Sequence, residues 1–185
     1  MGQKYPPKPM RGWPGTDLHR HLIEDPEWIA EPKKNGERCI VQSGRLRNEN
    51  GSHTIKILTR RNHIMSGVPQ ILQDILGEMM NHGIHLDCEF VDKSLIWLFD
   101  IPNLPLPLKA RRKRLVEFYE YRTSVGDRKL IKLMPWIPKE TAYESSVANG
   151  DEGTVFKNIN SLYVPQLESN NETPCWVKFK KPENW

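Results

Sequence analysis

The stretch WIAEPKKNGERCIVQS, residues 28–43, predicts two neighbouring strands joined by a tight turn. The first strand covers residues 28–31, and the chain then turns at Lys34-Asn35-Gly36, because Asn-Gly is a strong turn signal. The second strand covers residues 38–43. This arrangement places Lys33 at the end of a strand, beside a glycine turn, where a side chain can be held near a phosphate.

The rest of the chain predicts short strands and a few helices. Helical spacing of apolar residues indicates a helix over residues 68–80, with Gly83 as its C-cap. Further helices are predicted over 109–122 and 139–149, and a short helical segment over 17–24. Strands are predicted over residues 53–59, 85–91, 95–101, 130–136, 154–158 and 175–180, with a hairpin loop over 47–51. This mixture predicts an α+β fold.

The composition narrows the class of protein. The chain has 185 residues, of which 37% are hydrophobic and 27% charged, as expected for one globular domain. No run of about 18 apolar residues predicts a membrane span, and the N-terminus does not resemble a signal peptide. Three distant cysteines argue against a disulfide framework or zinc site and favour a reducing, cytoplasmic location. The net charge of +4 permits a nucleic-acid partner without requiring one.

Lys33 is the first residue that could carry chemistry. A lysine nitrogen becomes nucleophilic only when it loses its proton, and burial and neighbouring cations favour that loss. Taken alone, the segment also fits a surface hairpin of mixed charge. In the strand over residues 85–91, alternation places Asp87 and Glu89 on one face, where they could bind a ribose or a metal or simply face solvent.

Two further segments are equally ambiguous in isolation. Asp151-Glu152-Gly153 precedes a strand that ends in Lys157, and its carboxylates suit magnesium, although a tight turn explains it as well. Near the end of the chain, alternation places Lys178 and Lys180 on one strand face together with Trp176. Two parallel lysines form a phosphate site, but lysines also protect the edge strands of sheets.

Considered together and in this order, the segments resemble the motifs of the covalent nucleotidyltransferase superfamily, which contains ATP-dependent DNA ligases, RNA ligases and mRNA capping enzymes. Lys33-x-Asn35-Gly36-x-Arg38 resembles the motif KxDGxR, Thr59-Arg60-Arg61-Asn62 resembles SRxG, and Leu86-Asp87-Cys88-Glu89-Phe90 resembles LDGEF. Leu98-Phe99-Asp100-Ile101 resembles FDI, Glu152-Gly153-Thr154-Val155-Phe156-Lys157 resembles EGxVxK, and Lys178-Phe179-Lys180 resembles KxK. They extend over nearly the whole chain. Asn35 replaces an aspartate and Cys88 a glycine, and neither change removes a charged group that takes part in the chemistry.

The resemblance implies a reaction. Lys33 would attack the α-phosphate of ATP, expel pyrophosphate and carry AMP, which would then pass to a 5′-phosphate at a nick. By this resemblance, Lys178 and Lys180 would bind phosphate, Lys157 would make a further phosphate contact, and Glu152 would bind Mg²⁺ or another divalent cation. Glu31 would recognise the adenine amine, Phe99 would stack on adenine, and Arg38 and Glu89 would contact the ribose. Arg60 and Arg61 would bind the nucleic acid.

The resemblance also implies the architecture. We expect an ATP-grasp-like nucleotidyltransferase fold of antiparallel sheets flanked by helices, without the C-terminal OB-fold domain. Residues 1–27 would form a proline-rich lead-in, 28–181 the adenylation domain and 182–185 the start of an interdomain linker. The expected partner is nicked double-stranded DNA, or RNA, with a separate OB-fold or clamp protein completing a monomeric enzyme.

Several alternatives remain at this stage. An RNA ligase is the nearest, whereas capping enzymes usually have Asp-Gly where this chain has Glu152-Gly153. A non-catalytic relative would be expected to have lost Lys33, Glu152 or a terminal lysine. The basic run over residues 109–114 could bind nucleic acid or form a solvated helix face above a buried apolar side.

Overall fold

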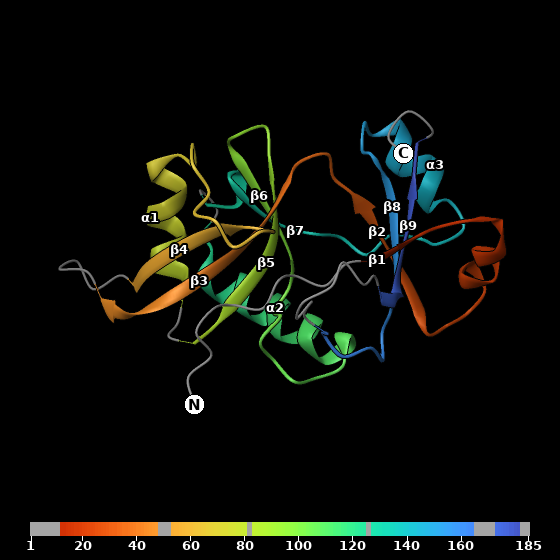
Figure 1. The fold of residues 1–185 in the computed structure, drawn as a ribbon, viewed down its shortest axis with the longest axis horizontal. Helices are drawn as coiled ribbons and strands as arrows, with labels where there is room; N and C mark the ends of the chain where they lie inside the picture. Colours follow the sequence, from red (N-terminus) through yellow and green to blue (C-terminus); the bar gives the residue numbers. More distant parts are fainter. Residues whose placement is uncertain (1–11, 48–52, 81–82, 125–126, 165–172, 182–185) are drawn as a thin grey trace.

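The computed structural model describes residues 12–47, 53–80, 83–124, 127–164 and 173–181. Two sheets lie side by side, and the turn between β2 and β3 carries the chain from one to the other (Figure 1). The five-stranded sheet has the order β4-β3-β5-β6-β7 and the four-stranded sheet the order β1-β9-β8-β2. The elements are β1 (Gly12–Pro14), β2 (Trp28–Lys33), β3 (Glu37–Arg47), β4 (His53–Thr59), β5 (His85–Val91), β6 (Leu95–Asp100), β7 (Ile131–Leu133), β8 (Gly153–Asn158), β9 (Thr173–Lys180), the helices α1 (Gln70–Met79), α2 (Leu108–Arg122) and α3 (Ala142–Ala148), and the 3-10 helices η1 (Asp17–Ile23) and η2 (Asp127–Lys129).

The α+β prediction is confirmed, and most elements lie where the sequence placed them. Two edge strands differ from a purely antiparallel arrangement, because β7 pairs with β6 and β1 pairs with β9 in parallel. The predicted helical C-cap at Gly83 is wrong. Helix α1 ends at Met79, because Met80 already has an extended backbone with ψ 137°. The predicted hairpin loop lies almost entirely outside the described residues.

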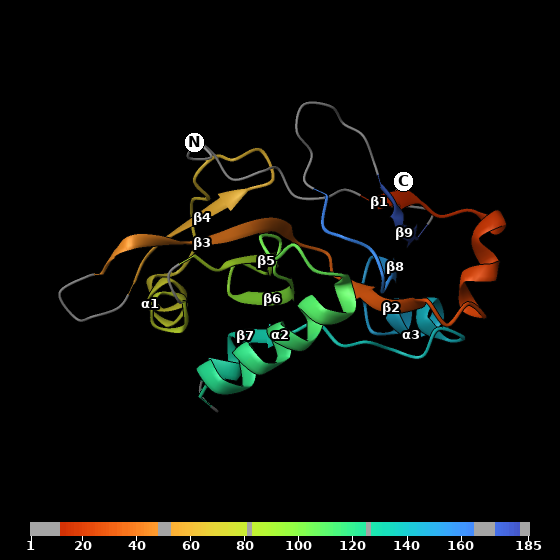
Figure 2. The same cartoon turned by 90° about the horizontal axis from the view of Figure 1, so that it is seen from below.

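Each sheet buries one face under helices and turns the other toward its neighbour. Helices α1 and α2 lie on the same side of the five-stranded sheet (Figure 2). Their buried Leu76 and Leu115 join Val41, Cys88 and Leu98 of the sheet in one apolar core. On the four-stranded sheet, α3 and η1 cover the smaller core, which contains Leu22, Ala30, Ala142, Phe156 and Val177. Because side chains alternate along a strand, charged residues such as Glu31, Glu89 and Lys178 lie on the opposite faces, where they line a pocket.

The basic run on α2 is not a uniform solvated face, which corrects one of the two interpretations of it. Arg111 is completely buried and pairs with Asp100, with its Nε 2.7 Å from Oδ1 and its Nη2 2.9 Å from Oδ2. Its Nη1 donates to the carbonyls of Leu106 and Ser161. Arg111 therefore ties α2 to the end of β6 and to the loop after β8.

In the described part of the chain, none of the helices combines the length and the apolar character needed to cross a bilayer.

Candidate active site

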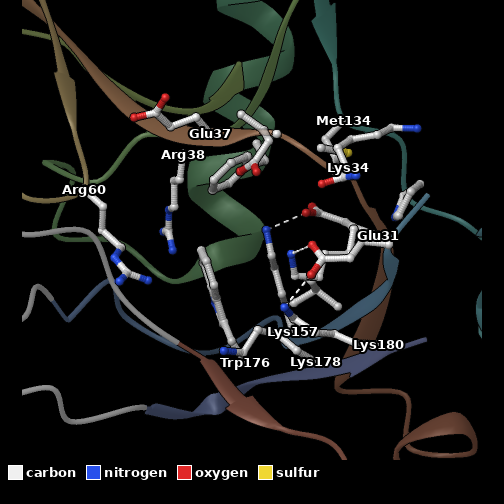
Figure 3. Close-up of a pocket in the computed structure, with 18 of the residues that line it drawn as sticks. Glu31, Lys34, Glu37, Arg38, Arg60, Met134, Lys157, Trp176, Lys178 and Lys180 are labelled. Carbon is white, nitrogen blue, oxygen red and sulfur yellow. Dashed lines mark hydrogen bonds and ion pairs between the residues drawn. The ribbon is translucent and has the colours of Figure 1, made fainter. Parts of the chain in front are cut away.

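A pocket of about 730 Å³ lies between the two sheets. This volume is within the range of sites that enclose small molecules. Figure 3 shows Arg38 and Arg60 on one side of it and Glu31 on the other, with Trp176 between them. Every residue that the sequence assigned to the site lines this pocket, namely Glu31, Lys33, Arg38, Arg60, Arg61, Glu89, Phe99, Glu152, Lys157, Lys178 and Lys180.

The register of the four-stranded sheet explains how distant motifs meet. Strand β8 lies between β2 and β9, so residues paired across the three strands point to the same face. Read from β2 through β8 to β9, three rows of paired residues result: Lys33–Gly153–Lys180, Glu31–Val155–Lys178 and Ile29–Lys157–Trp176. Strand β9 also pairs with β1 on its other side, so it is an inner strand, which excludes the alternative that its lysines protect a sheet edge.

Gly153 separates the two lysines of the first row. It has φ 151°, and a Cβ atom built there would lie 1.9 Å from the backbone oxygen of Phe179. A side chain at this position would require the two strands to move apart. The glycine of the EGxVxK-like motif thus lets β9 approach closely enough for Lys180 and Lys33 to share one partner.

That shared partner is Glu152. Its Oε2 accepts from Lys33 Nζ, and its Oε1 pairs with Lys180 Nζ. Burial opposes ionisation of this carboxyl, but the hydrogen bonds and charges of Lys180 and Lys33 outweigh burial and lower the pKa of Glu152. Glu152 is therefore held as a carboxylate between two lysines of the pocket lining.

The neighbouring lysine has a different partner. Lys34 Nζ donates to both carboxylate oxygens of Asp151, at 2.8 and 2.9 Å, and lies 4.5 Å from the ring centroid of Trp97. Asp151, predicted as half of a metal-binding pair, is thus occupied by Lys34. The structure therefore distinguishes the adjacent lysines by their partners.

Arg38 is fixed by a buried acid. Its Nε and Nη2 donate to Asp87 at 2.9 and 2.6 Å, and Tyr163 Oη donates to the same carboxylate at 2.5 Å. The guanidinium lies 5.2 Å from the ring centroids of both Phe99 and Trp176. Asp87 is completely buried, so it orients Arg38, while only Glu89 of the predicted acidic pair lines the pocket.

Glu89 is the acid whose ionisation is most strongly affected. Burial raises its pKa to about 7, in spite of the opposing charges of Lys33 and Arg38, and the nearby Asp87 and Glu152 add to the rise. When a carboxyl keeps its proton in the folded protein but releases it in the unfolded chain, the folded protein loses stability as the pH rises. Between pH 4.5 and about 7, Glu89 should therefore reduce the free energy of unfolding.

We predict that Glu89→Gln removes this dependence. Glutamine resembles the neutral acid and does not titrate, so only the protein with Glu89 loses stability through this group as the pH rises. Measured relative to that protein, the free energy of unfolding of the variant should rise by on the order of 2–3 kcal/mol between pH 4 and pH 8. Urea denaturation at several pH values measures it, and the difference cancels the contributions of other groups. Parallel pH profiles for the two proteins would contradict the prediction.

Glu31 and Lys157 form a second ion pair, away from Lys33. Both side chains are 3% exposed, and Lys157 Nζ donates to Glu31 Oε2. The same nitrogen lies 4.7 Å from the ring centroid of Phe99 and 4.2 Å from that of Trp176. Lys157 was expected to contact a phosphate, but its nitrogen lies among a carboxylate and two aromatic rings.

Arg60 and Arg61 lie at the exposed rim of the pocket, in the turn that follows β4. The turn depends on Asn62, which has a left-handed backbone with φ 64°. Asparagine tolerates this conformation better than most residues do. His63, which the sequence did not assign to the site, joins them in the lining.

Some site residues could not have been found by motif. Trp136, Tyr163 and Met134 belong to none of the segments that suggested the site, and no local pattern marks them. Trp176 had a weak signal, because it alternates with Lys178 and Lys180 on β9.

Glu152 is the residue best suited to a divalent cation. Among the described residues there is no group of three or more histidine, cysteine or acidic side chains arranged to hold a metal. Mg²⁺ commonly uses one or two carboxylates and completes its coordination with water and substrate phosphates. A single ionised carboxylate, such as that of Glu152, can supply one ligand to such an ion.

Comparisons with known proteins lead to one group of enzymes. No family model matches the chain. It is 28% identical over 169 residues to a DNA ligase of Methanocorpusculum labreanum, covering 80% of this chain and 29% of that protein. It is 30% identical over 131 residues to DNA ligase 2 of Methanosarcina mazei, covering 63% of this chain and 22% of that protein. The chain thus spans less than a third of the length of these curated relatives.

Among solved structures, those with a similar fold include DNA ligases. The chain is similar to mycobacterial DNA ligase D complexed with ATP and MES, with a TM-score of 0.69, 20% identity, and coverage of 94% of this chain and 60% of that one. It is similar to Chlorella virus DNA ligase-adenylate with a TM-score of 0.63, 15% identity, and coverage of 94% and 68%. The comparisons agree with the resemblance that the motifs indicated: the chain is similar in sequence to DNA ligases, and its fold is that of DNA ligase structures solved with ATP or as the adenylate.

Proposed function

We propose that this chain catalyses the first chemical step of an ATP-dependent DNA ligase, in which Lys33 becomes adenylated. The observation that supports this most directly is the cluster of Lys33, Glu152 and Lys180 within one pocket, assembled from three separate motifs. Lys33 Nζ forms a bond to the α-phosphorus of ATP, and the bond to the pyrophosphate oxygen breaks. Such a transfer depends mainly on positioning and on neutralising phosphate charge.

The surrounding residues supply those two requirements. Lys178 and Lys180 hold oxygens of the α-phosphate, while Glu152 orients Lys33 and holds Mg²⁺ or another divalent cation, which offsets phosphate charge when bound. Glu31 accepts from the adenine amine and Phe99 stacks on the base. Arg38 and Glu89 contact the ribose, and Lys157 contributes to ATP binding from the side of Glu31. These assignments follow the motif resemblance, and each of these residues lines the pocket.

The nucleic-acid partner is proposed on the same basis. Arg60 and Arg61 lie exposed at the rim, where they could meet the 5′-phosphate of nicked double-stranded DNA. Residues 28–181 would act as the adenylation domain, assisted by an OB-fold or clamp partner during sealing. The two ligase relatives favour DNA over RNA as the substrate.

A labelling experiment tests the proposal. The protein is incubated with Mg²⁺ and either α-³²P-labelled ATP or α-³²P-labelled GTP, denatured, and digested. We expect label from ATP on the peptide that contains Lys33, removed again when pyrophosphate is added. A chase with nicked DNA should release the label faster than a chase with nicked RNA. No covalent label, or label on another peptide, would overturn the proposal, and label from GTP alone would indicate a guanylyltransferase.

A further inference from the structure

The carboxylate of Glu31 is held from behind as well as from within the pocket. Trp136 Nε1 donates to Glu31 Oε1 across 3.1 Å, while Lys157 Nζ donates to the other oxygen. Glu31 faces the pocket, whereas Trp136 does not belong to the described residues that line it. A nucleotide in the pocket would therefore meet Glu31 in an orientation that Trp136 helps to set.

Trp136 is itself fixed by helix α2. The guanidinium carbon of Arg112 lies 5.6 Å from the centroid of the indole ring. Arg112 Nη2 also donates to the carbonyl of Met134 across 2.6 Å, and Met134 lines the pocket two residues before the tryptophan. This contact holds the segment after β7 against the helix. The indole N–H is thus aimed at Glu31 by the fold, before any ligand binds.

The chemistry of the two partners limits what Glu31 can accept. An ionised carboxylate has about four lone-pair sites and offers no donor. Both protein partners are donors, so the lone pairs that remain can only receive a further hydrogen. A base with an exocyclic amine supplies such a hydrogen, whereas a base with a keto oxygen would place its lone pairs against those of the carboxylate. A carboxylate held in one orientation discriminates between the amine-bearing and the keto-bearing base more strongly than a carboxylate that can rotate away.

We propose that Trp136 is a positioning residue that fixes Glu31 for selection of 6-aminopurine nucleotides. Trp136 is not among the described residues that line the pocket, so it would act through Glu31. This inference rests on the proposed function, because it concerns which nucleotide reaches Lys33. The proposal assigns a role to Trp136, which belongs to none of the motifs, and to the half-buried Arg112 of α2, which holds the tryptophan in place.

The test uses Trp136→Phe, which keeps one aromatic ring beside Arg112 and removes the N–H donor together with the second ring of the indole. The rate of adduct formation is measured against the concentration of ATP and, separately, of purine riboside triphosphate, whose base has hydrogen in place of the amine. For ATP, the half-saturating concentration should rise about tenfold, as expected for loss of a hydrogen bond that orients a charged acceptor, with the maximal rate unchanged. For the amine-free analogue it should hardly change.

A matched control is Trp28→Phe, since Trp28 lies on the same strand as Glu31 but is partly buried against the smaller core that η1 and α3 cover. This control should leave the preference for ATP over the analogue unaltered. An equal loss with both nucleotides in Trp136→Phe would indicate general damage to the pocket and would overturn the inference, as would an unchanged preference. If the native protein formed no adduct with any nucleotide, the proposed function itself would fail, which is a distinguishable outcome.

Discussion

Lys33→Ala is expected to abolish covalent labelling by ATP. The side-chain nitrogen is the atom that would bond to phosphorus, so its removal eliminates the intermediate, with a loss on the order of 10³-fold or more in adduct formation. The variant also leaves Glu152 paired with Lys180, so the pocket keeps a carboxylate–lysine contact. Gel detection of ³²P on the protein measures the effect, and circular dichroism checks the fold.

The adjacent lysine provides the matched control. Lys34 differs from Lys33 by one position and lines the same pocket, but its nitrogen is bound to Asp151. Lys34→Ala should therefore still form the adduct, although Asp151 loses its partner. Persistent labelling of Lys33→Ala would show that the adduct does not form on Lys33, and an equal loss in both variants would show that the loss is not specific to the Lys33 nitrogen.

Asp100→Ala is expected to cause the largest loss of stability. Asp100 and Arg111 are both completely buried, and removing the acid leaves an uncompensated guanidinium in the core. Such a change typically costs about 3–5 kcal/mol. For a chain of this size, it corresponds to a fall in Tm of roughly 10 °C or more. Differential scanning calorimetry measures it, with Asp74→Ala on the exposed side of α1 as the control that should change stability little.

A double variant separates the buried charge from simple loss of packing. Asp100→Leu combined with Arg111→Met removes both charges and keeps much of the apolar volume, so it should be more stable than Asp100→Ala. If the double variant were the less stable of the two, the pair would stabilise the fold by more than charge compensation. If Asp100→Ala unfolded at the same temperature as Asp74→Ala, the buried ion pair would have no importance for stability.

Local sequence was sufficient to predict most of the elements. The alternating strands over residues 85–91 and 95–101 were placed to within one residue of β5 and β6, because an apolar strand bounded by a polar turn is recognisable from a short window. The predicted end of the helix at residue 80 lies within one residue of the end of α1, but the C-cap is Met80 with an extended backbone and not Gly83. Strand β7 is shorter than predicted, since only three residues pair with β6.

The α+β class, the order of the motifs and the residues that line one pocket could all be predicted from the linear chain. Each motif is short and local, so its residue types and spacing can be recognised there. The partners of these residues follow from the folded arrangement: Glu152 joins Lys33 to Lys180, Asp87 orients Arg38, and Trp136 reaches Glu31. These contacts depend on strand register and on the packing of two sheets, which bring together residues far apart in sequence. No local pattern encodes that proximity, and for that reason Arg111 could not be recognised as buried from the basic run in which it lies.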